Sequence, residues 1–346
     1  MRPFPYRERE VVVPHPGGHV LAGTLTLPGE KEFGPGPYVA VALKTGGGQE
    51  DRDSSALGHK TFLVLSDALT RRRVAVMRYD DRGVGGSTVD EQTPVGKDAT
   101  SLDLSTDAVA VVRHLATIEE IDAARIGLIG HSEGGLIAPL ACRDEPLVAF
   151  VVMLAGPCVS GATVFHAQLR AAWIRGVGDS PELDALCDLF AGYQRRLGDG
   201  GSSDALAMDR AALAELAVDA GLFADAPDPE KLAAAEADFE MFDAPWWRFM
   251  FGYRPAETLA RVGQPILALN GTLDVQVDAE ANLTALEELA RSSDLDVTTR
   301  RLEGMNHLFQ PATTGAPEEY AEIEITMDPS VLALIADWID ERIAAR

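Results

Sequence analysis

A serine framed by glycines is the residue of this 346-residue chain best suited to covalent chemistry. Residues 130–134 read Gly-His-Ser-Glu-Gly, follow an apolar run at 126–129 and precede a segment with helical spacing of apolar residues. A Gly-x-Ser-x-Gly pentapeptide between a strand and a helix is typical of a nucleophile elbow, a strained turn that holds the serine hydroxyl clear of the sheet. We therefore predict that Ser132 is a nucleophile. The alternative is a glycine-rich turn that carries an ordinary exposed serine.

A serine hydroxyl needs a base, and the base needs a group that orients it. In a strand–helix fold with such an elbow, the acid and then the histidine follow the serine along the chain. His307 is the one histidine after Ser132 outside the helical segment described below, and it follows a predicted strand. Asp274 and Asp278 both follow the strand predicted at 265–269. Asp278 is better placed to cap the next helix, so Asp274 is the predicted orienting acid.

An attack on a carbonyl also requires two preset N–H donors for the oxyanion. The backbone amide of Glu133, next to the nucleophile, is the first candidate, and the loop at 45–53 after the third predicted strand should supply the second. This loop contains three glycines but no GK[ST] or GxGxxG pattern, so phosphate binding is not expected. Arg52 and Asp53 are predicted to lock the loop through ion pairs, with Glu133 and Asp81 as candidate partners.

The elements that must position these residues alternate between short apolar runs and helix-period segments. Strands are predicted at 11–13, 21–27, 38–44, 74–77, 126–129, 150–154, 265–269 and 297–302. This alternation predicts an α/β fold with a mostly parallel central sheet flanked by helices. It is interrupted at 158–255, which reads as helices with polar turns. We therefore expect a core formed by 1–157 and 256–346, with 158–255 inserted as a helical cap.

Composition excludes several functional classes. The formal net charge is −24, so nucleic acid and anionic membrane surfaces would repel the chain. Three cysteines without a CxxC pair fit a reducing compartment, and the charged start of the sequence lacks an apolar signal segment. The apolar runs are too short to span a bilayer, so a cytoplasmic protein is expected. Without an HExxH motif or a Cys/His cluster, neither a metal nor a cofactor is expected.

Seven of the 22 aromatic residues fall within residues 239–253, near the end of the predicted cap. One interpretation is packing between the cap and the core. The other is an apolar acyl pocket, because ligand pockets are mostly apolar with few polar anchors. The predicted pocket residues are Trp246, Trp247, Met250 and Phe251, together with His59 near the glycine-rich loop.

Four motifs together resemble the α/β-hydrolase superfamily, and the resemblance covers nearly the whole chain. Residues 46–53 are similar to Gly-Ser-Gly-Pro-Gln-Asp-Arg-Asp, and 79–87 fit Tyr-Asp-x-Arg-Gly-x-Gly-x-Ser. Residues 270–277 fit Asn-Gly-x-x-Asp-x-Gln-Val, and 306–310 read Asn-His-Leu-Phe-Gln. Within the superfamily, the chain resembles the esterase-like branch with a His-Ser-Glu-Gly-Gly elbow, which includes serine-aminopeptidase-like and dienelactone-hydrolase-like proteins.

The resemblance implies hydrolysis of a small carboxylic ester or thioester through an acyl-enzyme, with Ser132, Asp274 and His307 as the triad. By its match to the motif, Gly47 is the second oxyanion donor, although glycine replaces the usual serine there and Gln49 replaces proline. The alternatives are a pathway thioesterase, acyltransferase or cyclase, or a peptidase. A non-catalytic binding module is the least favoured reading, and the oligomeric state is left open.

Overall fold

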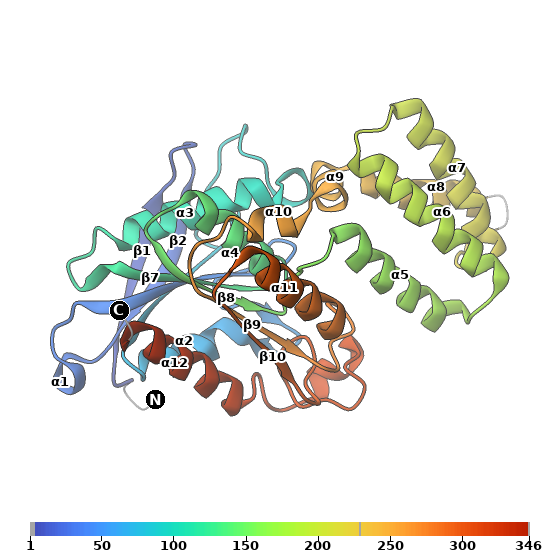
Figure 1. Cartoon of the computed structure of the whole chain (residues 1–346). Helices are drawn as coiled ribbons and strands as arrows, with labels where there is room; N and C mark the ends of the chain where they lie inside the picture. The colour runs from blue at the N-terminus through green and yellow to red at the C-terminus, as the bar shows by residue number, and fades with distance from the viewer. Residues whose placement is uncertain (1–3, 228–229, 345–346) are drawn as a thin grey trace. The chain divides into compact units, whose positions relative to one another are not determined.

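The computed structural model describes residues 4–227 and 230–344 and contains an eight-stranded sheet (Figure 1). Its order is β1-β2-β6-β3-β7-β8-β9-β10. The strands are β1 (Arg7–Pro14), β2 (Val20–Leu27), β3 (Tyr38–Lys44), β6 (Val74–Tyr79), β7 (Ile121–His131), β8 (Val148–Leu154), β9 (Ile266–Gly271) and β10 (Val297–Leu302). β1 and β2 pair antiparallel, as do β2 and β6, and the other pairs are parallel. The strands β4 (Ser55–Ala56) and β5 (His59–Lys60) form a separate small ribbon.

Helices cover both faces of the large sheet (Figure 1). The helices in the part of the chain that contains this sheet are α1 (Glu30–Phe33), α2 (Thr61–Thr70), α3 (Ser101–Leu115), α4 (Glu133–Asp144), α10 (Pro255–Leu259), α11 (Ala279–Ser293) and α12 (Pro329–Ala344). Short 3-10 turns lie at Gly96–Asp98 and Pro317–Glu322. α2 and α12 pack together on one face, where Phe62 and Ile335 join a core with Val41 of the sheet. α3 and α4 cover the other face.

The predicted fold class is confirmed, since all eight predicted strands are present and the sheet is mostly parallel. The inner strands β6 and β8 are buried along their whole length, which is why they read as continuous apolar runs rather than as alternating patterns. The antiparallel β1–β2 hairpin turns at residues 16–18, which read Pro-Gly-Gly. The order of parallel strands brings the loops after β3, β7, β9 and β10 to the same edge of the sheet.

A second compact unit consists of Val159–Arg254 together with Lys97–Thr100. The main segment differs by one residue at each end from the insert proposed at 158–255, while 97–100 carried no signal in the sequence. Its helices are α5 (Gly161–Val177), α6 (Pro181–Gly198), α7 (Ser203–Asp219), α8 (Lys231–Glu240) and α9 (Pro245–Gly252), with a 3-10 turn at Met241–Asp243. Serine caps begin three of them: the side chains of Ser160, Ser180 and Ser202 each accept a bond from the backbone N–H three residues later.

Within residues 4–227 and 230–344, no helix has the length and apolar character needed to cross a bilayer.

Candidate active site

Ser132 occupies a strained turn between β7 and α4. Its φ of 55° and ψ of −121° lie in a region that non-glycine residues rarely adopt, at a cost of about 1–3 kcal/mol. Two hydrogen bonds fix this turn: Ser132 N–H donates to Leu154 O at the end of β8 (2.8 Å), and Gly135 N–H donates to Ser132 O (2.9 Å). The strain and its restraints are those expected of a nucleophile elbow.

The glycines around the serine are required by close backbone contacts. A Cβ on Gly134 would lie 2.2 Å from Lys44 O and 2.4 Å from Thr45 O, and a Cβ on Gly130 would lie 1.9 Å from Gly134 O. Because real Cβ atoms do not approach backbone oxygens so closely, only glycine lets α4 begin against the end of β3. The same contacts place the loop after β3 beside the elbow.

His307 and Asp274 meet at the carboxyl ends of β10 and β9. The His307 Nδ1 atom lies 2.8 Å from Asp274 Oδ2, and the two residues are 4% and 5% exposed. Asp274 Oδ2 also accepts a bond from Asn270 Nδ2 (3.2 Å), and Oδ1 accepts the backbone N–H groups of Gln276 (2.8 Å) and Val277 (2.9 Å). With Nδ1 directed at a carboxylate, Nε2 is the nitrogen that remains to exchange a proton.

The second acid considered from sequence has a different position. The Asp278 side chain accepts the N–H of Ala281 at 2.7 Å and caps α11. Of the two aspartates, Asp274 is therefore the one that contacts His307.

The loop that carries His307 is held by two residues, Asn306 and Gln310, for which no role was predicted from the sequence. Asn306 Oδ1 accepts the backbone N–H groups of Leu308 (3.0 Å) and Gln310 (3.0 Å). The side chains of Asn306 and Gln310 are fully buried, and Asn306 Nδ2 donates to Gln310 Oε1 at 2.9 Å. Both amides belong to the Asn-His-Leu-Phe-Gln motif, and this motif is the sequence signal that could have indicated their role.

His131, next to the nucleophile, also supports this loop. Its Nε2–H donates to His307 O at 2.9 Å, and the two ring centroids lie 4.7 Å apart. Burial, followed by the nearby His307, lowers the pKa of His131 to about 4. His131 is therefore neutral at pH 7 and provides a fixed hydrogen-bond donor.

The glycine-rich loop after β3 approaches the nucleophile at Gly46. A Cβ on Gly46 would lie 3.2 Å from Ser132 Cβ and 3.5 Å from His131 O. The Gly46 N–H itself donates to Glu50 Oε1 at 3.1 Å. No bond to the N–H of exposed Gly47 is found within the described ranges, so Gly47 offers the next amide along the loop.

Asp81 ties this loop to the sheet. Its carboxylate pairs with Lys44 and accepts the Thr45 hydroxyl at 3.0 Å. The Glu50 N–H also donates to Asp81 Oδ2 (3.3 Å), while Asp81 N–H donates to Glu50 O (3.1 Å). Both Lys44 and Asp81 are about 2% exposed or less, so this pair leaves no isolated buried charge.

The predicted ion pairs of Arg52 and Asp53 exist, but their predicted partners were wrong. Arg52 forms a two-pronged contact with Asp80, from Nε to Oδ1 (3.0 Å) and from Nη2 to Oδ2 (2.8 Å), and its Nη1 contacts Glu10 at 2.7 Å. Asp53 pairs with Arg78 on the neighbouring strand β6.

The partners proposed from sequence are occupied elsewhere. Asp81 takes Lys44, because β3 and β6 are neighbours and these two residues lie at their carboxyl ends. Glu133 Oε1 accepts the hydroxyl of Ser101, at the start of α3, at 2.6 Å.

His59 is buried away from solvent, with both ring nitrogens engaged. Nδ1 lies 3.0 Å from Thr326 Oγ1, and Nε2 lies 2.9 Å from Tyr320 O. These contacts give the ring a structural role in joining β5 to the segment before α12. Both ring nitrogens thus have partners within the chain, and a place for His59 in the substrate pocket stays a prediction.

Within the second unit, Trp246, Trp247 and Phe251 of α9 belong to an aromatic cluster. Trp247 contacts Phe165 and Phe242 with ring centroids 4.7 Å apart in each case, and Trp246 lies 4.6 Å from Trp247. Phe251 is 1% exposed in the same cluster. All four cap residues predicted to line a pocket lie on this helix: Trp246, Trp247, Met250 and Phe251.

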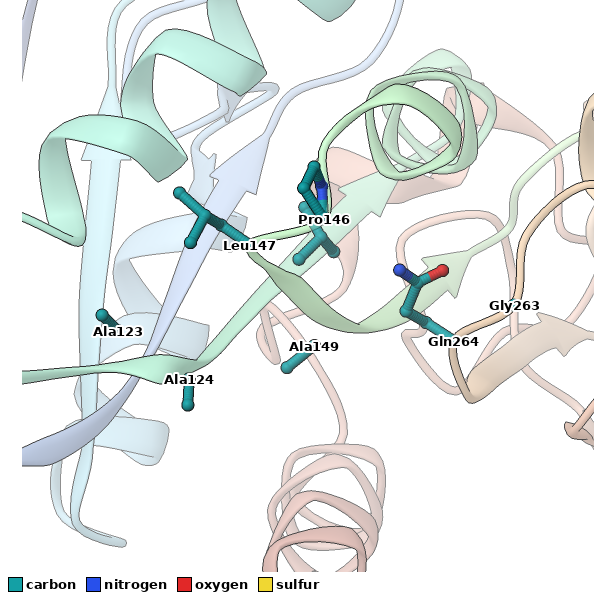
Figure 2. Close-up of a pocket in the computed structure, with 8 residues that line it drawn as sticks. Ala123, Ala124, Pro146, Leu147, Ala149, Gly263 and Gln264 are labelled. Carbon is teal, nitrogen blue, oxygen red and sulfur yellow. The ribbon is translucent and has the colours of Figure 1, made fainter.

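Two hollows in the first unit lie apart from Ser132. Figure 2 shows one of about 420 Å³, lined by Ala124, Leu147 and Gln264 among others. These residues stand near the amino ends of β7, β8 and β9, whereas ligands bind at the carboxyl ends in sheets of this kind. The other, of about 600 Å³, lies between the β1–β2 turn, α3 and α4.

The chain also matches known proteins along most of its length. The model of the alpha/beta hydrolase family matches residues 46–323. Esterase EstD of Thermotoga maritima is 22% identical over 341 residues, which are 97% of this chain and 68% of that protein.

Solved structures show the same fold at low identity. The structure titled as the complex of DcsB with its substrate analogue has a TM-score of 0.56 and 16% identity over 98% of this chain and all of that one. The Pyrococcus furiosus esterase PF2001 has a TM-score of 0.53 and 14% identity, covering 86% of this chain and 81% of that chain. The matched family model covers more than half of the sequence and includes the elbow, the glycine-rich loop, Asp274 and His307. The chain belongs to the alpha/beta hydrolase family.

Proposed function

We propose that this protein is a serine hydrolase that cleaves carboxylic esters or thioesters through an acyl-enzyme. The observation that carries the proposal is the buried His307–Asp274 pair at 2.8 Å, at the same sheet edge as a serine held in a strained elbow. The names of two relatives, EstD and PF2001, support an ester as the substrate class. Serine as nucleophile and a histidine oriented by a carboxylate are the parts that acyl transfer needs.

In the proposed acylation, Ser132 Oγ attacks the ester carbonyl while His307 Nε2 takes the hydroxyl proton. Asp274 stabilises the imidazolium and keeps Nδ1 as its donor. The backbone amides of Glu133 and Gly47 stabilise the oxyanion. Collapse of the tetrahedral intermediate breaks the bond to the alcohol or thiol, which leaves with the proton from His307.

Deacylation repeats the sequence with water. His307 takes a proton from a water molecule while the water oxygen attacks the acyl carbonyl. The proton then passes to Ser132 Oγ as the acid is released. The triad and oxyanion groups also serve acyl transfer or cyclisation when another nucleophile replaces water. Measured product identity distinguishes these reactions from hydrolysis.

The test is hydrolysis of a p-nitrophenyl ester series from acetate to decanoate by the wild type, Ser132→Ala and a Ser292→Ala control. Ser292 lies exposed near the end of α11. We expect release of nitrophenol by the wild type and the control, with at least 10³-fold less by Ser132→Ala. A folded wild type no faster than Ser132→Ala on every ester would overturn the proposal.

A further inference from the structure

Glu50 restrains the first glycine of the loop beside the nucleophile. Its Oε1 accepts the Gly46 N–H at 3.1 Å, and its Oε2 accepts the Ser54 hydroxyl at 2.7 Å. Its own backbone is fixed by the reciprocal bonds with Asp81. The Glu50 side chain thus links residue 46 to residue 50, whose own backbone is held in place.

The Glu50 carboxylate and Ser132 flank the same glycine. The point where a Gly46 Cβ would stand lies 3.1 Å from Glu50 Oε1 and 3.2 Å from Ser132 Cβ. Only the space of one methyl group therefore separates this acceptor from the residue that carries the nucleophile. A shift of the carboxylate would be transmitted to the loop where it faces Ser132.

The loop needs such a restraint because glycines cost the most conformational entropy to fix. Residues 46–48 are all glycine, Gly47 and Gly48 are exposed, and Gly48 has a φ of +98°. Oxyanion donors act only when they are preset before the reaction. The bond from Gly46 to Glu50 also commits the Gly46 N–H, which leaves the Gly47 N–H to face a substrate.

The groups around Glu50 indicate that it works as an acceptor. The charged groups that act on it are Lys44 from β3 and Asp81 from the loop after β6, and Ser54 contacts it from its own loop. Burial raises the pKa of the Glu50 carboxyl, against the opposing effects of the Ser54 bond and Lys44. A neutral amide oxygen at the same place can also accept the Gly46 N–H.

We propose that Glu50 is a positioning residue that presets the oxyanion loop by accepting the Gly46 N–H. The proposal rests on the serine hydrolase function proposed above. The role requires a side chain at position 50 that is long enough to place an acceptor where Oε1 lies, and it does not require a negative charge.

Two conservative variants separate these properties. Glu50→Gln keeps the reach and loses the charge, whereas Glu50→Asp keeps the charge and withdraws the acceptor by one methylene. We expect kcat of Glu50→Gln on p-nitrophenyl acetate within threefold of the wild type. We expect kcat of Glu50→Asp at least tenfold lower, with KM changed less than threefold. Glu91→Gln and Glu91→Asp, at an exposed loop position, are the controls and should match the wild type.

Each kcat is normalised to the serine titrated by a fluorophosphonate, so that a misfolded fraction does not lower it. The pH profile of kcat/KM between pH 5 and 8 adds a readout of charge, and we expect the profiles of Glu50→Gln and the wild type to coincide. Glu50→Asp equal to the wild type, or Glu50→Gln impaired as much as Glu50→Asp, would overturn the role of Glu50. A wild type that neither hydrolyses esters nor reacts with the fluorophosphonate would instead overturn the underlying function.

Discussion

Replacement of Asp274 by asparagine tests how the acid acts on His307. Asp274 Oδ1 accepts two backbone amides, at Gln276 and Val277, while Oδ2 faces His307 Nδ1 and Asn270 Nδ2. An asparagine can keep the two backbone bonds through its carbonyl oxygen. Its NH₂ group then faces His307 Nδ1, which must become an acceptor, and the proton moves to Nε2. The base is left in the wrong tautomer.

The expected loss follows from that change of tautomer. Serine enzymes of this design lose about 10⁴-fold in kcat when the acid becomes an amide, which corresponds to about 5.4 kcal/mol of transition-state stabilisation. Stability should fall much less, by about 1–3 kcal/mol, because the bonds at Oδ1 persist while two NH₂ groups now face each other at Asn270. The assay is kcat for p-nitrophenyl acetate at pH 8, with urea unfolding as the check on folding.

Asp278→Asn is the matched control, four residues away. Asparagine caps a helix about as well as aspartate, so both activity and stability should be retained. A folded Asp274→Asn within tenfold of the wild type would refute the orienting role of Asp274. A loss confined to Asp278→Asn would show that the acid had been misassigned.

Three further changes test the supports of the site, each by urea unfolding. Burial lowers the pKa of His131 to about 4, so below about pH 6.5 the unfolded chain gains a proton that the folded chain does not. Between pH 7.5 and 5.0, the free energy of unfolding should therefore fall by about 2 kcal/mol more for the wild type than for His131→Asn. Equal falls would contradict the buried neutral ring. Arg52→Lys removes the two-pronged contact with Asp80 and should reduce the free energy of unfolding by about 1–3 kcal/mol, whereas no change would show that the contact is dispensable. Gly134→Ala places a methyl group 2.2 Å from a backbone oxygen and should cost at least about 3 kcal/mol of stability or prevent folding. The control Gly176→Ala, in open space near the end of α5, should be neutral or stabilising by up to about 1 kcal/mol. Equal effects of the two substitutions would refute the need for glycine at position 134.

The sequence predicted the features that depend on local pattern. Buried parallel strands are continuous apolar runs, so their positions were readable, and parallel strands end at one edge, so the loops with Asp274 and His307 were expected to meet. Their 2.8 Å contact agrees with that expectation, while their role in catalysis remains a proposal. The distinction between Asp274 and Asp278 was also local, because a helix cap needs only the next three residues.

The features that sequence missed depend on which strands become neighbours. Asp81 pairs with Lys44 because β3 lies beside β6, an order that no short motif encodes. The contact of the His59 ring with Tyr320, 261 residues away in the chain, was not predicted either. Such contacts follow from the assembled sheet and its covering loops, so they become visible only in the structure.

Covalent labelling of the nucleophile tests the proposed role of Ser132 most directly. The purified protein is treated with a fluorophosphonate, and its intact mass and proteolytic peptides are measured for the wild type, Ser132→Ala and His307→Asn. We expect one phosphonyl group per wild-type chain, located on Ser132, with no label on Ser132→Ala and much slower labelling of His307→Asn. A folded wild type that stays unlabelled, or that carries the label on another residue, would contradict the assignment of Ser132 as the nucleophile.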